Sequence, residues 1–296
     1  MRNLARHLFL RTAFLLFFTF QGIAQDRIPM HRGNKPPLTK EQAAERLQQF
    51  RNQRLSRDFI FQFELEHLPR RGDSVLYNGV LWGTWGEAGP MIRARFATEP
   101  EAFHGKSLEV LLKNGIQPKA WFRLLKTDKP DQAGPLPNFV ELPPNHWYRE
   151  LLPGVGYTSF DLLMPFTYWE NTRYLKPDKV KGRPAQVYQA FPPKNFPGAG
   201  VKFSSVKYIL DDSYNALLRV QLLDKDEKPI QTFKIQDFKK IQDGEWIVKT
   251  IDLLNEKTRD KARFRVVAAK LHDVLHPLVF DPEQTAVPQP SQLKRF

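Results

Sequence analysis

Two glutamates, Glu64 and Glu66, form the carboxylate pair whose spacing could serve acid–base chemistry. Side chains alternate along a strand, so residues two apart share a face and could flank a glycosidic bond as acid and base. The same stretch places Phe61, Phe63 and Leu65 on the opposite face. This alternation favours the solvent-facing side of a half-buried strand over a catalytic site.

Two further pairs have the spacing of metal ligands. His272 and His276 would lie one turn apart in a helix, a spacing that can hold zinc, but no third ligand is near in the sequence. Asp224 and Asp226 begin like a calcium loop but lack its glycine and its terminal glutamate, which favours a hairpin turn. We therefore expect no metal site and no cofactor.

The sequence contains none of the common nucleophile or phosphate-binding motifs: no Gly-x-Ser-x-Gly elbow, no His-Glu-x-x-His and no Walker loop. It also has no cysteine, which excludes disulfides, thiolate metal sites and a catalytic thiol. Gly154 and Gly156 favour a turn over a phosphate cradle. We therefore expect no catalytic residue.

The first 24 residues have the three zones of a secretory signal peptide. Three arginines, Arg2, Arg6 and Arg11, precede the apolar run over residues 12–20. The small residues around Ala24 are typical of a cleavage site. The apolar run is about half of the roughly 20 residues that a membrane span needs, which favours a cleaved leader over a retained anchor. We expect a periplasmic protein, exported and cleaved near Ala24.

The chain is strongly basic. Its 296 residues carry a formal net charge of +13, and removing the three leader arginines leaves +10. In an exported protein this charge favours an anionic membrane surface as a partner, the alternative being a basic surface that serves only solubility. The positive residues are spread, with no run of five or more, so we expect no nucleic-acid partner. We also expect a monomer.

A helix is predicted to begin at Thr39, after a linker over residues 25–37. Thr39 can cap the helix, and Gln42 stands where it would complete a capping box. Leu47 and Phe50 continue an apolar stripe at helical spacing. We expect this helix to extend to about Leu55.

The apolar period then changes to two, which predicts antiparallel strands. The expected strands cover residues 59–66, 75–85, 91–97, 108–112, 120–124, 139–142, 185–191, 202–210, 216–223, 230–239, 246–253 and 262–269. Turn chemistry such as Asn114-Gly115 separates them. Strands without helical crossovers predict one antiparallel sheet, strongly curved or partly closed.

A second short helix is predicted from Phe160 to Trp169, capped by Thr158 and apolar on almost every side. Pro165 is expected to bend or break it. A helix of this kind must be enclosed or must cover an apolar surface. The tail over residues 285–296 contains prolines and is expected to be disordered.

Between about Phe59 and Phe280 the chain resembles the LolA-like family of outer-membrane lipoprotein-sorting proteins. The segments that carry the resemblance are residues 81–86, 158–169, 181–185, 208–211 and 244–246. The resemblance implies an α+β fold that is mainly antiparallel: an incomplete β-barrel over residues 38–284, closed by the N-terminal helix and a short lid helix. Compared with the compact carriers of that family, this chain has an insertion over residues 126–153.

The resemblance also implies an apolar cavity that shelters acyl chains during transit across the periplasm. It places the first strand in one wall of the cavity and the second helix beside it. The lipid-binding residues expected on this basis are Phe59, Phe61, Phe63, Leu65, Phe160, Leu163, Met164, Phe166 and Trp169. The leading hypothesis is a non-enzymatic carrier of lipid or lipoprotein acyl chains. Its alternatives are a lipid-sensing or envelope-stress module on the same fold and, less favoured, a secreted hydrolase that uses Glu64 and Glu66.

Overall fold

The described part of the chain consists of one large antiparallel sheet with two α-helices and three short 3-10 helices. The computed structural model describes residues 36–86, 89–97, 106–126, 137–152, 154–241, 244–272, 274–284 and 293–296. The predicted leader, most of the predicted linker and residues 285–292 of the predicted tail lie outside the described residues.

The N-terminal half contains α1 (Lys40–Asn52), β1 (Asp58–Leu68), β2 (Val75–Gly86), β3 (Gly89–Ala97), β4 (Lys106–Lys113), β5 (Lys119–Lys126), β6 (Val140–Leu142) and η1 (Pro144–His146). The C-terminal half contains α2 (Ser159–Leu163), η2 (Pro165–Tyr168), β7 (Thr172–Val180), β8 (Arg183–Ala190), β9 (Ser205–Asp211), β10 (Leu217–Leu223), β11 (Pro229–Lys240), β12 (Trp246–Asn255), β13 (Lys261–His272) and η3 (Pro277–Phe280).

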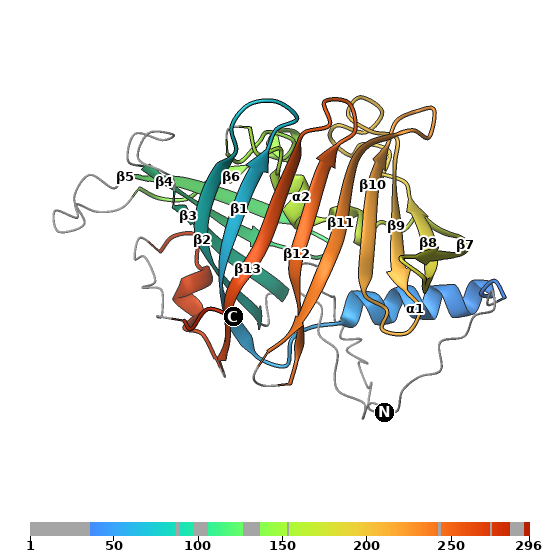
Figure 1. Ribbon diagram of the computed structural model, residues 1–296, viewed down its shortest axis with the longest axis horizontal. Helices are drawn as coiled ribbons and strands as arrows, with labels where there is room; N and C mark the ends of the chain where they lie inside the picture. The colour runs from blue at the N-terminus through green and yellow to red at the C-terminus, as the bar shows by residue number, and fades with distance from the viewer. Residues whose placement is uncertain are drawn as a thin grey trace, which may run out of the picture.

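The sheet has thirteen strands in the order β6-β5-β4-β3-β2-β1-β13-β12-β11-β10-β9-β8-β7 and is open at both ends. The strands curl, so that β4 and β5 cross behind the upright strands β11 to β13 and α2 lies between the two layers (Figure 1). The predicted fold class, an α+β fold with a strongly curved and incomplete antiparallel barrel, is confirmed.

The pairing of the first strand with the last joins the two halves of the sheet. β1 runs antiparallel to β13, with Phe61 opposite Ala269 and Leu65 opposite Phe264. On its other side β1 pairs with β2. Every other pair joins strands that follow one another in the chain, so this single long-range pairing makes two meanders into one sheet.

One strand was not predicted from the sequence. β7 contains Pro177 and three basic residues and lacks a regular apolar alternation. This pattern is typical of a loop between secondary-structure elements. Because β7 lies at the edge of the sheet, one side of its backbone needs no partner, and an edge is where a strand tolerates proline and lysine.

α1 begins where the sequence predicts and ends early. The Thr39 hydroxyl accepts from the Gln42 amide, and the Gln42 side chain accepts from the Thr39 amide at 2.9 Å, which completes the predicted capping box. The backbone turns to an extended conformation at Gln53, so the predicted end near Leu55 is wrong by three residues. The helix buries Phe50 against the sheet, where its ring stacks on Tyr208.

The predicted second helix is broken, as Pro165 indicated. α2 ends at Leu163, and Met164 takes a left-handed conformation with φ of 43° before η2 begins at Pro165. Proline disfavours the helical region for the residue before it, which explains why the break falls at Met164. The break turns the chain so that Phe160 and Phe166 face one another in the core, 6.2 Å apart.

Two glycines of β2 make room for two rings of β1. Phe59 lies opposite Gly83 and Phe63 opposite Gly79 in the register of the two strands. A Cβ atom at Gly83 would lie 2.0 Å from the Phe59 ring. Each ring therefore lies across β2 in the place that a side chain would otherwise take, and this close packing supports the curvature of the sheet.

Gly83→Ala should therefore lower the free energy of unfolding by about 1–3 kcal/mol, because the added methyl displaces a buried ring. In a Phe59→Leu background the same substitution should cost about 1 kcal/mol less, since the ring is gone. Urea denaturation of the four proteins of this cycle measures the coupling. An equal cost of Gly83→Ala in both backgrounds would contradict the packing described.

A buried cluster of charged side chains connects β3, β4 and β5 on their outer face. The Glu109 carboxylate accepts from Arg93 at 2.7 Å, Arg95 at 2.8 Å and Arg123 at 2.8 Å. Glu109, Arg93 and Arg123 have fully buried side chains. Burial alone would raise the pKa of Glu109, but the three arginines hold it below its ordinary value. The Phe139 ring covers the Arg123 guanidinium at 4.4 Å.

The C-terminal residues 274–284, which we call the strap, close over this cluster. Arg93 donates to the Val279 carbonyl at 3.1 Å, and Arg123 donates to the Gln284 carbonyl at 3.1 Å. Phe280 packs with Trp82 in the same outer cluster. Arg93 and Arg95 alternate along β3 with inward-facing Ile92, Ala94 and Phe96, so the cluster fixes strands whose other face lines the interior.

Glu109→Gln should destabilise the fold by about 3–5 kcal/mol, because it leaves three arginines without their buried counter-charge. The matched control is Glu141→Gln, which breaks the exposed pair with Lys119 and should cost less than about 1 kcal/mol. Thermal and urea denaturation measure both. Similar losses in the two variants would show that the buried cluster adds nothing specific.

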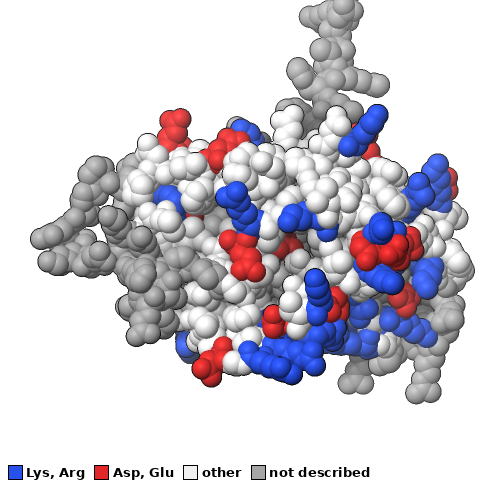
Figure 2. Space-filling model, turned by 90° about the horizontal axis from the view of Figure 1, so that it is seen from above, with Lys and Arg blue, Asp and Glu red and all other residues white. Residues whose placement is uncertain are grey.

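Charges of both signs are interspersed on the surface, with a run of Lys and Arg side chains along one edge of the face in Figure 2. Within the sheet, Arg219 of β10 lies directly opposite Lys234 of β11. Like charges directly opposite one another destabilise a sheet. An anion near this pair would reduce the repulsion between the two side chains. Within the described part of the chain, none of the helices combines the length and apolarity that crossing a membrane requires.

Residues 293–296, part of the predicted disordered tail, lie against the sheet. The Phe296 amide donates to the Val267 carbonyl at 3.0 Å, and Arg295 forms an ion pair with Glu64.

Candidate functional site

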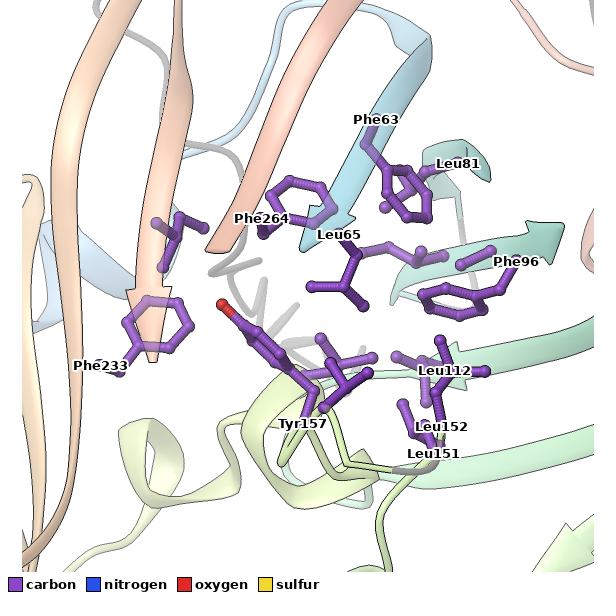
Figure 3. Close-up of a pocket in the computed structure, with 15 residues that line it drawn as sticks. Phe63, Leu65, Leu81, Phe96, Leu112, Leu151, Leu152, Tyr157, Phe233 and Phe264 are labelled. Atoms are coloured by element: carbon purple, nitrogen blue, oxygen red, sulfur yellow. The ribbon is translucent and has the colours of Figure 1, made fainter. Parts of the chain in front are cut away.

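An apolar cavity lies between the concave face of the sheet and the segment that precedes and forms α2 (Figure 3). The residues that line it are Phe63, Leu65, Leu81, Ile92, Ala94, Phe96, Leu112, Leu151, Leu152, Val155, Tyr157, Leu162, Phe233, Ile251 and Phe264. Tyr157 is the one lining residue with a polar side chain, and no lining residue is charged. The space that the centre of a water molecule could occupy is about 40 Å³.

Two structural units form the walls of the cavity. Strands β1 to β4 and β11 to β13 supply ten lining residues, and five come from residues 151–162. We call the described residues 150–152 and 154–163 the lid. The lining is continuous across the pairing of β1 with β13, where Phe63 packs on Phe264 with ring centres 4.9 Å apart.

The backbone of the lid is a closed loop followed by a capped turn of helix. Glu150 and Thr158 form an isolated antiparallel bridge, and the Leu151 amide donates to the Tyr157 carbonyl at 2.9 Å. Gly154 and Gly156 both have a positive φ, 73° and 75°, which confirms a turn here. The loop therefore holds its shape through its own backbone hydrogen bonds while its apolar side chains point into the cavity.

Asp161 organises the base of the lid. Its carboxylate accepts from the Thr158 amide at 2.9 Å and the Thr158 hydroxyl at 2.7 Å, and the Gln231 side chain of β11 donates to it at 2.9 Å. Burial raises the pKa of Asp161 to about 6, and these hydrogen bonds partly oppose the rise. Asp161 thus completes the capping box of α2 with Thr158 and connects the lid to the sheet.

The pKa of Asp161 makes a pH-dependent contribution to stability. The folded protein holds this proton more tightly than the unfolded chain, so the contribution of Asp161 to stability falls as pH rises from about 4 to about 6 and stays constant above that. The loss is up to about 3 kcal/mol. In Asp161→Asn, the difference in unfolding free energy between pH 4 and pH 7 should change by this amount relative to wild type.

Urea denaturation across this pH range provides the measurement. The control is Asp226→Asn, which also removes one carboxylate, but from the exposed β10–β11 turn, and so measures the effect of losing one negative charge at the surface. A wild-type profile in Asp161→Asn would rule out a raised pKa at this position.

The Tyr157 side chain reaches from the lid into the cavity. In Figure 3 its hydroxyl points away from α2, towards the space between Phe233 and Phe264. Tyr157 is 4% exposed, and its hydroxyl has no hydrogen-bond partner among the described residues. An apolar cavity thus contains one unpaired polar group.

The structure brings two of the nine predicted lipid-binding residues to the cavity, Phe63 and Leu65. The other seven are buried in the core beside it: Phe59, Phe61, Phe160, Leu163, Met164, Phe166 and Trp169. Phe160 lies in an aromatic cluster, 5.1 Å from Tyr148 and 5.2 Å from Phe203. The residues that cover the cavity are therefore mostly those before α2, and the contact of the nine residues with lipid remains a prediction.

Sequence reasoning did not assign Tyr157, Leu151, Leu152 or Val155 to the cavity. Leu151 and Leu152 lie near the end of the insertion over residues 126–153, and Val155 and Tyr157 lie beside the turn glycines Gly154 and Gly156. In neither stretch does a periodicity indicate which side chains face inward. Leu151 and Leu152 carried a weak signal, since an adjacent apolar pair in a polar loop must find cover. Phe233, Ile251 and Phe264 alternate correctly on their strands, but the pattern does not show which strands face the lid.

The candidate acid–base pair lies on the outer face of β1. Glu64 is paired with Arg265 at 3.2 Å and with Arg295. The cavity lies on the opposite face, with Phe63 and Leu65. The structure therefore places the two glutamates on a charged surface and away from the cavity.

The candidate metal-binding histidines do not share a helix. His272 is the last residue of β13, and His276 precedes η3, where its Nδ1 accepts from the Leu278 amide. The helical spacing assumed for zinc is therefore wrong. Among the described residues no group of three or more His, Asp or Glu could hold a metal ion. Asp224 accepts from the Asp226 and Lys228 amides in the β10–β11 turn, which bears out the hairpin interpretation.

Comparisons of sequence match only part of the chain. A family model described as an uncharacterized protein matches residues 161–284. No curated protein sequence matches the chain.

Comparisons of structure match most of the chain. An outer membrane lipoprotein-sorting protein domain from Vibrio parahaemolyticus has a TM-score of 0.61 at 16% identity, covering 76% of this chain and 89% of that one. A DUF1329 family protein from Desulfovibrio piger has a TM-score of 0.60 at 13% identity, covering 80% and 94%. A LolA superfamily protein from Nitrosomonas europaea has a TM-score of 0.52 at 12% identity, covering 82% and 98%. The chain therefore has the LolA-like fold that its sequence predicted.

Proposed function

We propose that this protein is an exported, periplasmic carrier that holds an acyl chain of a lipid or lipoprotein between the concave face of its sheet and its lid. The observation that carries the proposal is the cavity, whose fifteen lining residues include no charged side chain. The likeness in fold to a lipoprotein-sorting domain and the signal-like residues 1–24 support the same function. In this proposal the protein has no catalytic role.

An acyl chain would enter by displacing the lid. The volume that the centre of a water molecule could occupy, about 40 Å³, is too small for a long chain while the lid is closed. Each methylene that leaves water contributes about 0.8 kcal/mol, so ten buried methylenes contribute about 8 kcal/mol, enough to offset a substantial rearrangement. The chain would replace lid side chains as the partner of Phe63, Phe96 and Ile251 on the sheet.

The lid has a firm end and a loose end. At the firm end Phe160 is enclosed by Tyr148, Phe196 and Phe203. At the loose end, Gly154 and Gly156 lie in a loop held mainly by its own backbone hydrogen bonds. Opening by movement of residues 150–152 and 154–156, with Tyr157 and α2 retained, disturbs the fewest packed aromatic rings.

The charged part of a ligand would remain outside the cavity. A charge moved into apolar surroundings without a partner is costly, and the lining offers no counter-charge. Basic residues such as Arg219 and Lys234 on the sheet surface would instead attract anionic headgroups or an anionic membrane, an effect that salt weakens.

Filling the cavity should reduce acyl binding. Ala94 is 3% exposed and lines the cavity from β3, so Ala94→Leu adds bulk where the chain would lie. We expect at least a tenfold loss of affinity for an environment-sensitive fluorescent fatty-acyl probe, measured by titration of the purified mature protein. The control, Ala185→Leu, adds the same volume to a separate apolar cluster with Val187 and Ile209, and should bind as wild type does.

Hydrogen exchange gives a second measurement of the same event. On addition of the probe, exchange should change in residues 150–157 more than in β8 or β9. Wild-type protein that binds no acyl probe, and that carries no acyl species in native mass spectra after purification from an envelope fraction, would refute the proposed function.

A further inference from the structure

The unpaired hydroxyl of Tyr157 calls for an explanation, because buried polar groups in folded proteins are nearly always hydrogen-bonded. The hydroxyl is buried between the lining residues Phe233 and Phe264, with almost no surface open to the cavity, and it has no partner among the described residues (Figure 3). Its ring packs edge-on against Phe233, with centres 6.4 Å apart. Leaving a buried hydroxyl unpaired lowers stability, whereas a phenylalanine here would avoid that cost.

A bound water molecule does not provide the missing hydrogen-bond partner of the Tyr157 hydroxyl. The cavity has room for a water molecule, but a buried water typically makes about three hydrogen bonds. The lining offers one polar side chain, Tyr157 itself. A water molecule bound there would be poorly held, so the hydroxyl is suited to a partner that enters with an otherwise apolar ligand.

The hydroxyl can act as a donor at neutral pH. Burial, followed by the nearby carboxylates of Asp161 and Asp252, raises the pKa of Tyr157 well above its ordinary value, so the phenol keeps its proton. The partner must therefore be an acceptor. It must also be uncharged, because no cation lines the cavity to balance a carboxylate or phosphate.

We propose that Tyr157 donates a hydrogen bond to the neutral carbonyl oxygen of an ester- or amide-linked acyl chain, and so selects acylated ligands over simple hydrocarbons. This inference rests on the proposed function and adds the chemical class of the ligand. Tyr157 lies directly before the Thr158 cap of α2, so its backbone is fixed at the base of the lid. The carbonyl would lie near Phe233 and Phe264, with the chain extending along the sheet towards Phe63.

Two probes that differ at the carbonyl test the inference. They are 1-monopalmitoylglycerol, which has an ester, and 1-O-hexadecylglycerol, which has the same headgroup and a chain of the same length joined by an ether. We expect wild type to bind the ester more tightly, and Tyr157→Phe to lose about three- to tenfold in affinity for the ester with no change for the ether. The measurement is displacement of a bound fluorescent acyl probe from the purified mature protein.

The matched control is Tyr168→Phe. Tyr168 also has a buried hydroxyl without a partner among the described residues, but it lies outside the cavity lining, so this variant should bind both probes as wild type does. Without lipid, Tyr157→Phe should melt at the wild-type temperature or above, because it removes an unpaired polar group. This measurement separates loss of a hydrogen bond from loss of folding.

The outcomes distinguish this inference from the proposed function. If Tyr157→Phe binds both probes as wild type does, or loses affinity for both equally, the carbonyl contact is refuted while acyl binding stands. If wild type binds neither the two glycerol lipids nor the fluorescent acyl probe, the proposed function fails, and the inference fails with it.

Discussion

The burial of one strongly curved apolar sheet face is the constraint on which the rest of this structure depends. Phe63 and Leu65 face inward from β1, at the centre of the thirteen-stranded sheet, while Glu64 lies on the outer surface between them. A face this concave cannot pack flat against a second sheet, so helices and irregular segments must cover it. Such cover follows the curve imperfectly, and the cavity is the space that remains.

The outer face of β3, β4 and β5 is covered by a charged cluster instead of an apolar lid. There Glu109 binds three arginines, and the strap closes over them with Phe280. Buried ion pairs are sensitive to geometry, so this cluster fixes the relative positions of β3, β4 and β5 more strictly than apolar contacts alone would. A rigid wall is consistent with a lid that moves, because a ligand can then replace the lid without loss of the sheet.

The sequence predicted local structure well because local structure depends on patterns within a few residues. The alternation around Phe63, the capping box of Thr39 and the break at Pro165 each predicted an element that the structure contains. The pairing of β1 with β13 could not be predicted in this way, because the apolar pattern of one strand does not identify a partner strand that is distant in the sequence. β7 was missed because an edge strand does not need the apolar alternation by which strands are recognised.

The candidate site was predicted less well, because it too depends on contacts between residues that are distant in the sequence. A wall formed by Phe63, Phe233 and Phe264 depends on which strands the curvature brings to face the lid, and hence on the register of the whole sheet. The lid residues depend on the path of a loop, for which single-residue patterns carry little information. Aromatic excess in α2 and η2 indicated a cavity roof, but large rings are also the best core residues, and Phe160 and Phe166 serve as core. The less conspicuous Tyr157, a polar group in an apolar lining, reports more on the ligand, because its burial is costly unless something binds it.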